Sequence, residues 1–487
     1  MPNELQTESN WWARQCGPRD VLAIALPLIV STASWAIMNF VDRMFLLWYS
    51  PPAMAAAMPS GLLHFTIMCF PLGVASYTNT FVAQYIGAGR HDRIGRLMGQ
   101  SLYIGLITMP MFLLTIPLAS WIFTIAGHSP ELADLESTYY MVLAFGAGAT
   151  IMAASLSSFF TGRGVTKVVM VVDIGASLLN VGLDYLLIFG IGGLPSLGIV
   201  GAGLATVTSQ WARVVAYWLL MQTPQNRKTY QLRTVRQFDW KILRQLLRYG
   251  GPNGLQMLIE ISAFTILILI VGQLGEMEMA ATTLAFNINT VAFIPMLGMG
   301  IALATIVGQQ LGRNRPDLAT RATWTSLVLS IAYMGGMAIL YLTVPDLIMI
   351  GHSSGISDSN DFLMIKSTTK ILLQFVAVYS LFDALYIVFV SVLRGAGDTR
   401  FILITSMVIT PLPVIAAGLG IKYADWGLYW CWTVITAWIL SLGLVFSARF
   451  FGGKWRRMRV IEPDLFPGGK KIMPGPVATL HETEFPL

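Results

Sequence analysis

The sequence is poor in charge. Only 11 % of its 487 residues are Asp, Glu, Lys or Arg, against about 25 % in typical soluble domains, and 55 % are hydrophobic. A soluble protein of this length needs a charged surface that so few residues cannot supply, so we expect most of the surface to face lipid. The basic residues stand in short runs between apolar stretches, so the net charge of +6 indicates membrane topology and no nucleic acid partner.

Cysteine is scarce, and the motifs of soluble enzymes are missing. The three cysteines, Cys16, Cys69 and Cys431, have no spacing typical of a disulfide framework or a metal site. No GxxxxGK[ST] sequence occurs, and the glycine-rich stretches GAGRHD and RGAGDTR follow no expected strand. MPNELQTESNWWARQ lacks a basic region before a short apolar core, so we expect no cleaved signal peptide. We therefore expect neither an enzyme nor a bound cofactor.

Long apolar runs, in contrast, are abundant. About 20 apolar residues in a helix cross the roughly 30 Å core of a bilayer, and backbone groups inside lipid must be paired within that helix. This length predicts twelve spans, at 21–48, 54–86, 98–125, 137–160, 168–190, 198–221, 247–275, 279–310, 323–350, 368–392, 401–420 and 426–450. The fold class that we expect is an all-α membrane protein with twelve transmembrane helices.

The loops between these spans differ in charge. If both termini are cytoplasmic, 27 of the 31 Lys and Arg residues fall on the cytoplasmic side, as the positive-inside rule requires. The four exceptions are Arg43, Lys366, Lys370 and Lys422. The expected organisation is a cytoplasmic N-terminus (1–20), an N-lobe (21–222), a basic cytoplasmic linker (223–246), a C-lobe (247–450) and a partly disordered cytoplasmic tail (451–487). We expect that tail to lie on the inner leaflet through Trp455 and Arg456.

The two lobes carry an internal repeat. GVASYTNTFVAQYIGAGRHDRIGR (73–96) aligns without gaps on GMGIALATIVGQQLGRNRPDLATR (298–321) at an offset of 225, which pairs Gln84 with Gln309. TGRGVTK (161–167) matches RGAGDTR (394–400) at an offset of 233. Chance similarity between glycine- and arginine-rich loops is the alternative, but the first match also extends through the preceding helix.

This repeat predicts the symmetry of the fold. Because each half contains six spans, an even number, both halves enter the membrane in the same direction. We therefore expect two six-helix lobes related by a pseudo-two-fold axis along the membrane normal, an arrangement found in several transporter folds.

Acidic residues inside the expected spans are the candidate functional groups. They are Asp42, Asp173, Asp184, Glu260 and Asp383. An ionised residue at the bilayer centre costs about 2.5–3.5 kcal/mol on insertion scales, so it normally faces an internal cavity and marks function. At about 1.5 Å per helical residue, Glu260 and Asp383 are expected near the midplane, and Asp42 and Asp184 towards the outer side. The acids therefore form one predicted pair in each lobe.

Polar side chains accompany these acids at helical spacing. The candidate coupling residues are Glu260, Asp383 and Tyr379 in the C-lobe and Asp42, Asn180, Asp184 and Thr206 in the N-lobe; Gln256, Asn253 and Asn287 are candidate substrate contacts. Carboxylate, amide and hydroxyl oxygens suit Na⁺, whereas a desolvated carboxylate suits H⁺. Either cluster is therefore a possible Na⁺ site, and the coupling ion stays open between Na⁺ and H⁺.

Structural roles are the alternatives to these assignments. Asp42 could pair with Arg43 at the outer interface, and Asp173, close to the inner boundary, is expected to be a structural acid. His64 is expected to be a packing residue. The remaining polar side chains could serve only as hydrogen bonds between helices; they are Asn180, Thr206 and Gln256.

Several stretches, taken together and in order, resemble the multidrug and toxic compound extrusion (MATE) transporters over about residues 18–450. They are FVDRMFL, FVAQYIGAGR, TGRGVTKVVM, LLNVGLDYLLIFG, LGIVGAGLAT, VGQQLGRNR and LRGAGDTR. The resemblance implies two six-helix lobes around a central cleft that export organic cations in exchange for Na⁺ or H⁺.

Within that family, LIEISAF and YSLFDAL resemble the NorM-type branch. The resemblance implies that Glu260 and Asp383 are the C-lobe coupling residues, with Tyr379 beside them. Other members have a cation site in the N-lobe, and its positions match Asp42, Asn180, Asp184 and Thr206 here. Many NorM-type members have asparagine in place of Asp184, so this chain carries both sets.

The function that we expect from these features is secondary antiport. A monomer in the bacterial inner (plasma) membrane, in contact with lipids, would export cationic amphiphilic compounds by alternating access, driven by inward Na⁺ or H⁺. The alternative is a flippase for lipid-linked saccharides. A strongly cationic cleft would suit such anionic headgroups, whereas the intramembrane charges here are almost all acidic.

Overall fold

The structure of the protein is a computed structural model that describes residues 11–125, 129–193, 195–349 and 360–461. Within these ranges it is helical and contains no strand. The first half, called the N-half below, contains α2 (Pro18–Tyr49), α3 (Pro51–Ser76), α4 (Thr78–Gly87), α5 (Ile94–Ile125), α6 (Pro130–Arg163), α7 (Thr166–Phe189) and α8 (Gly198–Met221). The second half, called the C-half, contains α10 (Trp240–Gly272), α11 (Glu276–Gly312), α12 (Pro316–Thr343), α13 (Pro345–Met349), α14 (Asn360–Ala396), α15 (Thr399–Ile409), α16 (Pro411–Ala424) and α17 (Leu428–Phe451).

These helices confirm the all-α membrane fold. Among the described residues, 11 helical segments are long and apolar enough to cross a membrane. The twelfth expected span, 198–221, is α8 with the same bounds, but it is not among the eleven because polar side chains such as Gln210 and Arg213 lower its hydropathy. Two of the expected spans each consist of two consecutive helices. The span 54–86 is interrupted at Tyr77, between α3 and α4, and the span 401–420 at Thr410, between α15 and α16.

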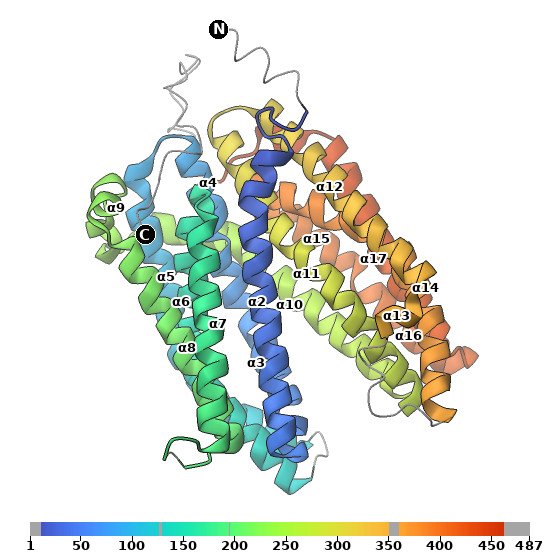
Figure 1. Cartoon of the computed structure of the whole chain (residues 1–487). Helices are drawn as coiled ribbons and strands as arrows, with labels where there is room; N and C mark the ends of the chain where they lie inside the picture. Colours follow the sequence, from blue (N-terminus) through green and yellow to red (C-terminus); the bar gives the residue numbers. More distant parts are fainter. Residues whose placement is uncertain (1–10, 126–128, 194, 350–359, 462–487) are drawn as a thin grey trace.

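The two halves lie side by side, and α2, α3 and α4 of the N-half pack against α10 and α11 of the C-half (Figure 1). Helix α2 packs against α11, α3 against α10, and α4 against α11. A Cβ atom on Gly73 would lie 2.4 Å from the Cα atom of Gly254, so α3 and α10 touch backbone to backbone. The ribbons of the halves diverge towards the bottom of Figure 1, away from α4 and α9 (Pro224–Thr229).

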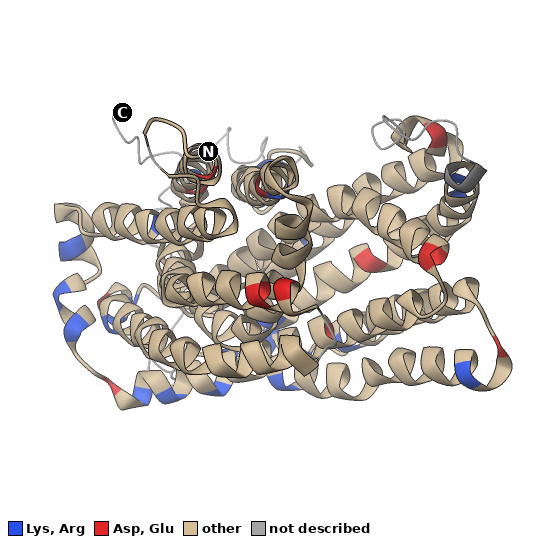
Figure 2. Ribbon diagram, turned by 90° about the horizontal axis from the view of Figure 1, so that it is seen from below, with Lys and Arg blue, Asp and Glu red and all other residues tan. Residues whose placement is uncertain are grey.

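The end of the bundle that contains α4 and α9 is called the basic end. It carries the linker between the halves, with α9 and the short helix η2 (Leu232–Arg236), and the segment after α17 with η4 (Lys454–Arg457). Seen along the bundle, most of the ribbon is neither acidic nor basic, and the basic residues gather towards the periphery (Figure 2). Lys366 and Lys370, two exceptions to the positive-inside count, both lie 2.8 Å from Asp346, so an acid compensates their charge.

Two reciprocal hydrogen bonds join the halves at the basic end. Gln84 Nε2 donates to the carbonyl oxygen of Gly395 at 2.9 Å, and Gln309 Nε2 donates to that of Gly162 at 2.8 Å. The two glutamines are partners in the sequence repeat, and so are the two glycines. The same bond is therefore made twice, once in each direction, and these four residues are called the glutamine seal.

Helices α4 and α11 approach closely beside this seal. A Cβ atom on Gly87 would lie 2.1 Å from the carbonyl oxygen of Gln309, and one on Gly312 would lie 2.3 Å from that of Gln84. Both distances are far below van der Waals contact, so only glycine fits at either position. The contact is again symmetric, because Gly87 and Gly312 are repeat partners.

The segment after α17 covers the glutamine seal. Val460 N donates to Gln84 Oε1 at 2.8 Å, and Trp455 is fully buried and stacked on Phe450 with ring centroids 5.2 Å apart. The expectation that Trp455 lies on the inner leaflet is therefore wrong, because its indole ring is buried in the core of the protein. Arg456 is exposed, and residues 462–487 of the expected tail lie outside the described residues.

Candidate functional site

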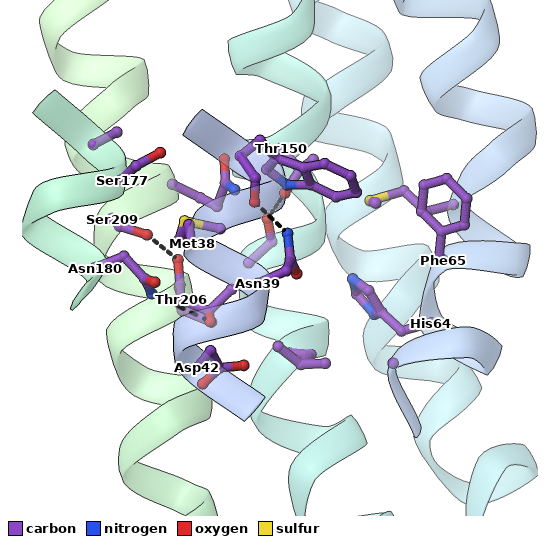
Figure 3. Close-up of a pocket in the computed structure, with 18 of the residues that line it drawn as sticks. Met38, Asn39, Asp42, His64, Phe65, Thr150, Ser177, Asn180, Thr206 and Ser209 are labelled. Carbon is purple, nitrogen blue, oxygen red and sulfur yellow. Dashed lines mark hydrogen bonds between the residues drawn. The ribbon is translucent and has the colours of Figure 1, made fainter. Parts of the chain in front are cut away.

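A cavity of about 560 Å³ lies within the N-half, between α2, α3, α6, α7 and α8 (Figure 3). Its wall includes large apolar and soft side chains, among them Trp35, Met38, Phe65, Met68 and Tyr139. Aromatic faces and methionine thioethers favour flat and cationic guests through cation–π and dispersion contacts. The cavity therefore has the size and lining of a small-molecule site.

Asp42 projects from α2 into this cavity, as Figure 3 shows. Its Oδ1 atom is buried and has no hydrogen-bond partner, and within the described residues Asp42 forms no ion pair. The alternative pairing with Arg43 is therefore not formed, although Arg43 also lines the cavity. A buried carboxylate oxygen without a partner is costly unless it binds a proton or a cation.

Asn180, Asp184 and Thr206 are brought together beside Asp42. The amide nitrogen of Asn180 lies 3.5 Å from Thr206 Oγ1; with the amide turned over, it donates to Asp184 Oδ2 at 3.0 Å and its oxygen accepts from Thr206 N at 3.2 Å. Asp184 is fully buried, its Oδ1 has no partner, and it interacts electrostatically with Asp42. The four N-lobe candidates thus form one group, called the acid cluster.

Asp173 has the structural role that the sequence predicts. Arg213 Nε donates to Asp173 Oδ1 at 2.7 Å, Tyr217 OH donates to the same oxygen at 2.7 Å, and Ser31 Oγ donates to Oδ2. These bonds tie α7 to α8 and α2, eleven residues or about 16 Å along α7 from Asp184. Sequence reasoning missed Arg213 because it counted this arginine with the cytoplasmic loops, although it lies on the cavity face of α8.

Both carboxylate oxygens of Glu260 in the C-half accept hydrogen bonds. Oε1 accepts from Gln256 Nε2 and from Ser406 Oγ, each at 2.9 Å, and Oε2 accepts from Tyr386 OH at 3.0 Å. Arg394 Nη2 in turn donates to Gln256 Oε1 at 3.0 Å. Three donors from three helices satisfy this carboxylate, in contrast to Asp42 and Asp184.

Asp383 and Tyr379 are buried one turn apart on α14, with 6 % and 1 % of their surface exposed. In the described ranges no hydrogen bond joins Asp383 to Glu260. Tyr386, which follows Asp383 by three residues on the same helix, donates to Glu260. This spacing was visible in the sequence and could have identified Tyr386, whereas nothing local indicated Arg394 or Ser406.

The three candidate substrate contacts lie in different places. Asn253 Nδ2 donates to the carbonyl oxygen of Gly73 at 2.8 Å, so it joins the halves where α3 and α10 touch. Gln256 belongs to the Glu260 network and is fully buried. Asn287 is exposed on α11. None of the three lines the N-half cavity, and their role towards substrate stays a prediction.

The donor atoms of the acid cluster fit a proton or a hard monovalent cation. It offers two unpartnered carboxylate oxygens, one amide and one hydroxyl, which are hard oxygen ligands. Within the described residues no group of three or more His, Cys, Asp or Glu has the arrangement of a metal site. His64 packs edge-on against Phe112, with ring centroids 5.1 Å apart, and it also lines the N-half cavity, so its role as a packing residue stays a prediction.

Comparisons with known proteins identify the family to which the chain is similar. The family model MatE matches residues 27–186 and 252–417, and the two matches begin 225 residues apart, the offset of the repeat. The chain is 28 % identical over 457 residues to the probable multidrug resistance protein NorM of Xylella fastidiosa, covering 92 % of this chain and 93 % of that protein. It is also 28 % identical to the multidrug resistance protein MdtK of Pectobacterium atrosepticum over 386 residues, 79 % of this chain and 83 % of the relative.

Solved structures share this fold. A transporter of the MOP superfamily from Pyrococcus furiosus superposes with a TM-score of 0.80 at 22 % identity, covering 90 % of this chain and 96 % of that one. A multidrug resistance MATE family transporter in an outward-facing conformation superposes with a TM-score of 0.79 at 22 % identity and the same coverage. These neighbours confirm the two-lobe architecture expected from the repeat.

Proposed function

The chain belongs to the MatE family of multidrug efflux transporters, and from this premise we propose that it exports cationic amphiphilic compounds in exchange for inward Na⁺ or H⁺. The observation that carries the proposal is the N-half cavity, because its apolar, aromatic wall also contains Asp42, whose Oδ1 atom is buried without a hydrogen-bond partner. Asp184 lies behind this wall and interacts electrostatically with Asp42. Such a wall accepts an apolar cation, and the acids neutralise its charge.

The acid cluster is the proposed coupling site. Asp42 and Asp184 interact electrostatically, so two ionised carboxylates there repel each other until a proton or a cation arrives. Binding of the driving ion then competes with binding of the organic cation. Glu260 and Asp383 remain a second candidate site, supported by the resemblance alone, because Glu260 is satisfied by protein donors.

Alternating access is the proposed transport cycle. The basic end is assigned to the cytoplasm, and the glutamine seal closes that end in the conformation described here. Opening to the cytoplasm then requires both reciprocal bonds to break. One charge crossing 100 mV supplies about 2.3 kcal/mol, enough at about 1.4 kcal/mol per decade for a roughly fifty-fold concentration gradient.

Ethidium efflux from reconstituted vesicles tests this function. The protein is incorporated into liposomes, and a Na⁺ gradient and a pH gradient are imposed separately. We expect one of the two gradients to drive ethidium against its concentration gradient. If neither does so, ion-coupled export is wrong.

A flippase for lipid-linked saccharides is the competing function, and the cavity does not favour it. Among its described lining residues the arginines are Arg43, which is exposed, and Arg213, which Asp173 already neutralises. A thermal-shift series that compares organic cations with lipid pyrophosphates separates the two. Stabilisation by the pyrophosphates alone would replace export of cations with lipid transfer.

A further inference from the structure

A second pocket, of about 830 Å³, lies at the basic end where α10 begins. The residues that line it are called the basic pocket: Trp240, Lys241, Arg244, Gln245, Leu247, Arg248 and Arg400. Three of the four basic residues come from α10 and the fourth from the first turn of α15. Among these described lining residues none is acidic, so the pocket is a site of concentrated positive charge outside the N-half cavity.

The helical repeat of α10 creates this pocket. Lys241, Arg244 and Arg248 follow one another at spacings of three and four residues, so they share one face over about 10 Å. The opposite face, which includes Ile242 and Leu246, is buried in the core. The three side chains therefore point away from the bundle and reach Arg400 across the gap between α10 and α15.

The acids closest in the sequence do not pair with Arg244 or Arg400. Asp239 caps α10 by accepting from the backbone nitrogens of Lys241 and Ile242, at 3.0 Å and 3.2 Å. Asp398 accepts from Arg449 Nε at 2.7 Å. Within the described residues, Arg244 and Arg400 form no ion pair, so both guanidinium groups are available to an external anion.

Exposed apolar side chains border the same charges. Trp240 is 61 % exposed and Leu247 is 40 % exposed, and both belong to the pocket. Tryptophan is typical of the level where lipid headgroups meet acyl chains. Gln245 Oε1 is buried without a hydrogen-bond partner. This oxygen could therefore accept a hydrogen bond from a hydroxyl or amine group of a bound ligand. Positive charge beside exposed apolar surface fits an amphiphilic anion better than a free phosphate.

We propose that the basic pocket binds the phosphodiester headgroup of an anionic phospholipid, with its acyl chains along Trp240 and Leu247. The guanidinium groups of Arg244 and Arg400 form charge-assisted hydrogen bonds to phosphate oxygens from two helices. Basic pockets between membrane helices bind such headgroups in this way. The inference rests on the membrane fold and is independent of the coupling ion and of the exported substrate.

Lipid titration of the purified full-length protein, followed by native mass spectrometry, tests the proposal. The pocket variant is Arg244→Gln/Arg400→Gln, and the matched control is Arg227→Gln/Lys228→Gln, which removes two charges from exposed positions of α9. Each basic residue that contacts the anionic headgroup directly contributes about a five-fold factor. We expect the pocket variant to bind cardiolipin about 30-fold more weakly, and the control to change by less than about three-fold.

Three results would overturn the site. Equal losses in the two double variants would mean that diffuse surface charge holds the lipid. Binding of phosphatidylcholine as tight as that of cardiolipin would remove the role of the headgroup charge. Displacement of cardiolipin by an equal concentration of inorganic pyrophosphate would assign the pocket to a soluble phosphate compound. If the double variant does not fold, Arg400→Gln alone has an expected five-fold loss under the same criteria.

Discussion

Removal of Gln84 is expected to open the basic end. In Gln84→Leu the side chain keeps a similar volume but loses both hydrogen-bonding groups. Two bonds disappear, the donation to Gly395 O and the acceptance from Val460 N. The first of them joins the two halves, and the second attaches the segment after α17 to the seal. The variant therefore weakens the closed basic end directly.

The size of the effect follows from these two bonds. When the basic end opens, the freed carbonyl and amide groups gain water, so each bond contributes only its net value of about 1 kcal/mol to the closed state. The loss of two bonds shifts the equilibrium by about 2 kcal/mol, or roughly 30-fold towards the open state.

Gln100 provides a matched control in the same protein. It is fully buried like Gln84, its Nε2 donates to Gln237 O at 2.8 Å, and its Oε1 accepts from Asp239 N at 3.2 Å. These bonds tie α5 to the linker before α10 and do not join α4 to the C-half. Gln100→Leu should therefore cost similar stability without the same shift towards the open basic end.

The distance between the two halves at the basic end reports the equilibrium. Spin labels at Asp92 and Asp317, repeat partners on the two halves, give this distance by electron spin resonance. We expect a larger long-distance population in Gln84→Leu than in wild type, and little change in Gln100→Leu. Equal distance distributions in the two variants would mean that the glutamine seal does not hold the basic end closed.

Three further predictions follow from the same contacts. Gln309→Leu removes only one hydrogen bond between the halves, so the same distance measurement should show the equilibrium shifted about five-fold towards the open basic end. A shift larger than that of Gln84→Leu would be inconsistent with the number of bonds removed. Gly87→Ala places a Cβ atom 2.1 Å from the carbonyl oxygen of Gln309, so it should prevent closure of the basic end. The control Gly182→Ala adds a Cβ atom in open space and should leave this closure unchanged. Closure of the basic end in both variants would disprove the close fit at Gly87. Asp173→Asn leaves Arg213 without its counterion and should cost about 3 kcal/mol, seen as a lower Tm, and an unchanged Tm would mean that the pair is not a structural clamp.

Much of the fold could be predicted from the sequence, because hydropathy marks the helices that lipid surrounds. The span 198–221 coincides with α8, and the repeat offset of 225 recurs in the family matches. The predicted span begins seven residues after the start of α10, since the first two turns of this helix carry Lys241 and Arg244 and are not apolar. Hydropathy detects only the part of a helix that lies in lipid.

The sequence predicts which site residues lie together only where a single helix or the internal repeat contains all of them. Asn180 and Asp184 share a face of α7, and the sequence placed them together correctly. The pairing of Asp173 with Arg213 and the donors around Glu260 depend on how separate helices pack, which spacing along the chain does not encode. Trp455 was misplaced for the same reason, because its burial depends on contacts with Phe450.

Ethidium efflux by Asp42→Asn, in vesicles with the driving ion gradient imposed, tests most directly whether the acid cluster couples ion entry to export. The substitution keeps the shape of the side chain and removes the charge from the acid cluster, and Asp92→Asn at the exposed basic end is the control. We expect Asp42→Asn to lose gradient-driven efflux and the control to retain it. Undiminished gradient-driven efflux in Asp42→Asn would contradict the assignment of the N-half cavity as the site where ion and substrate compete.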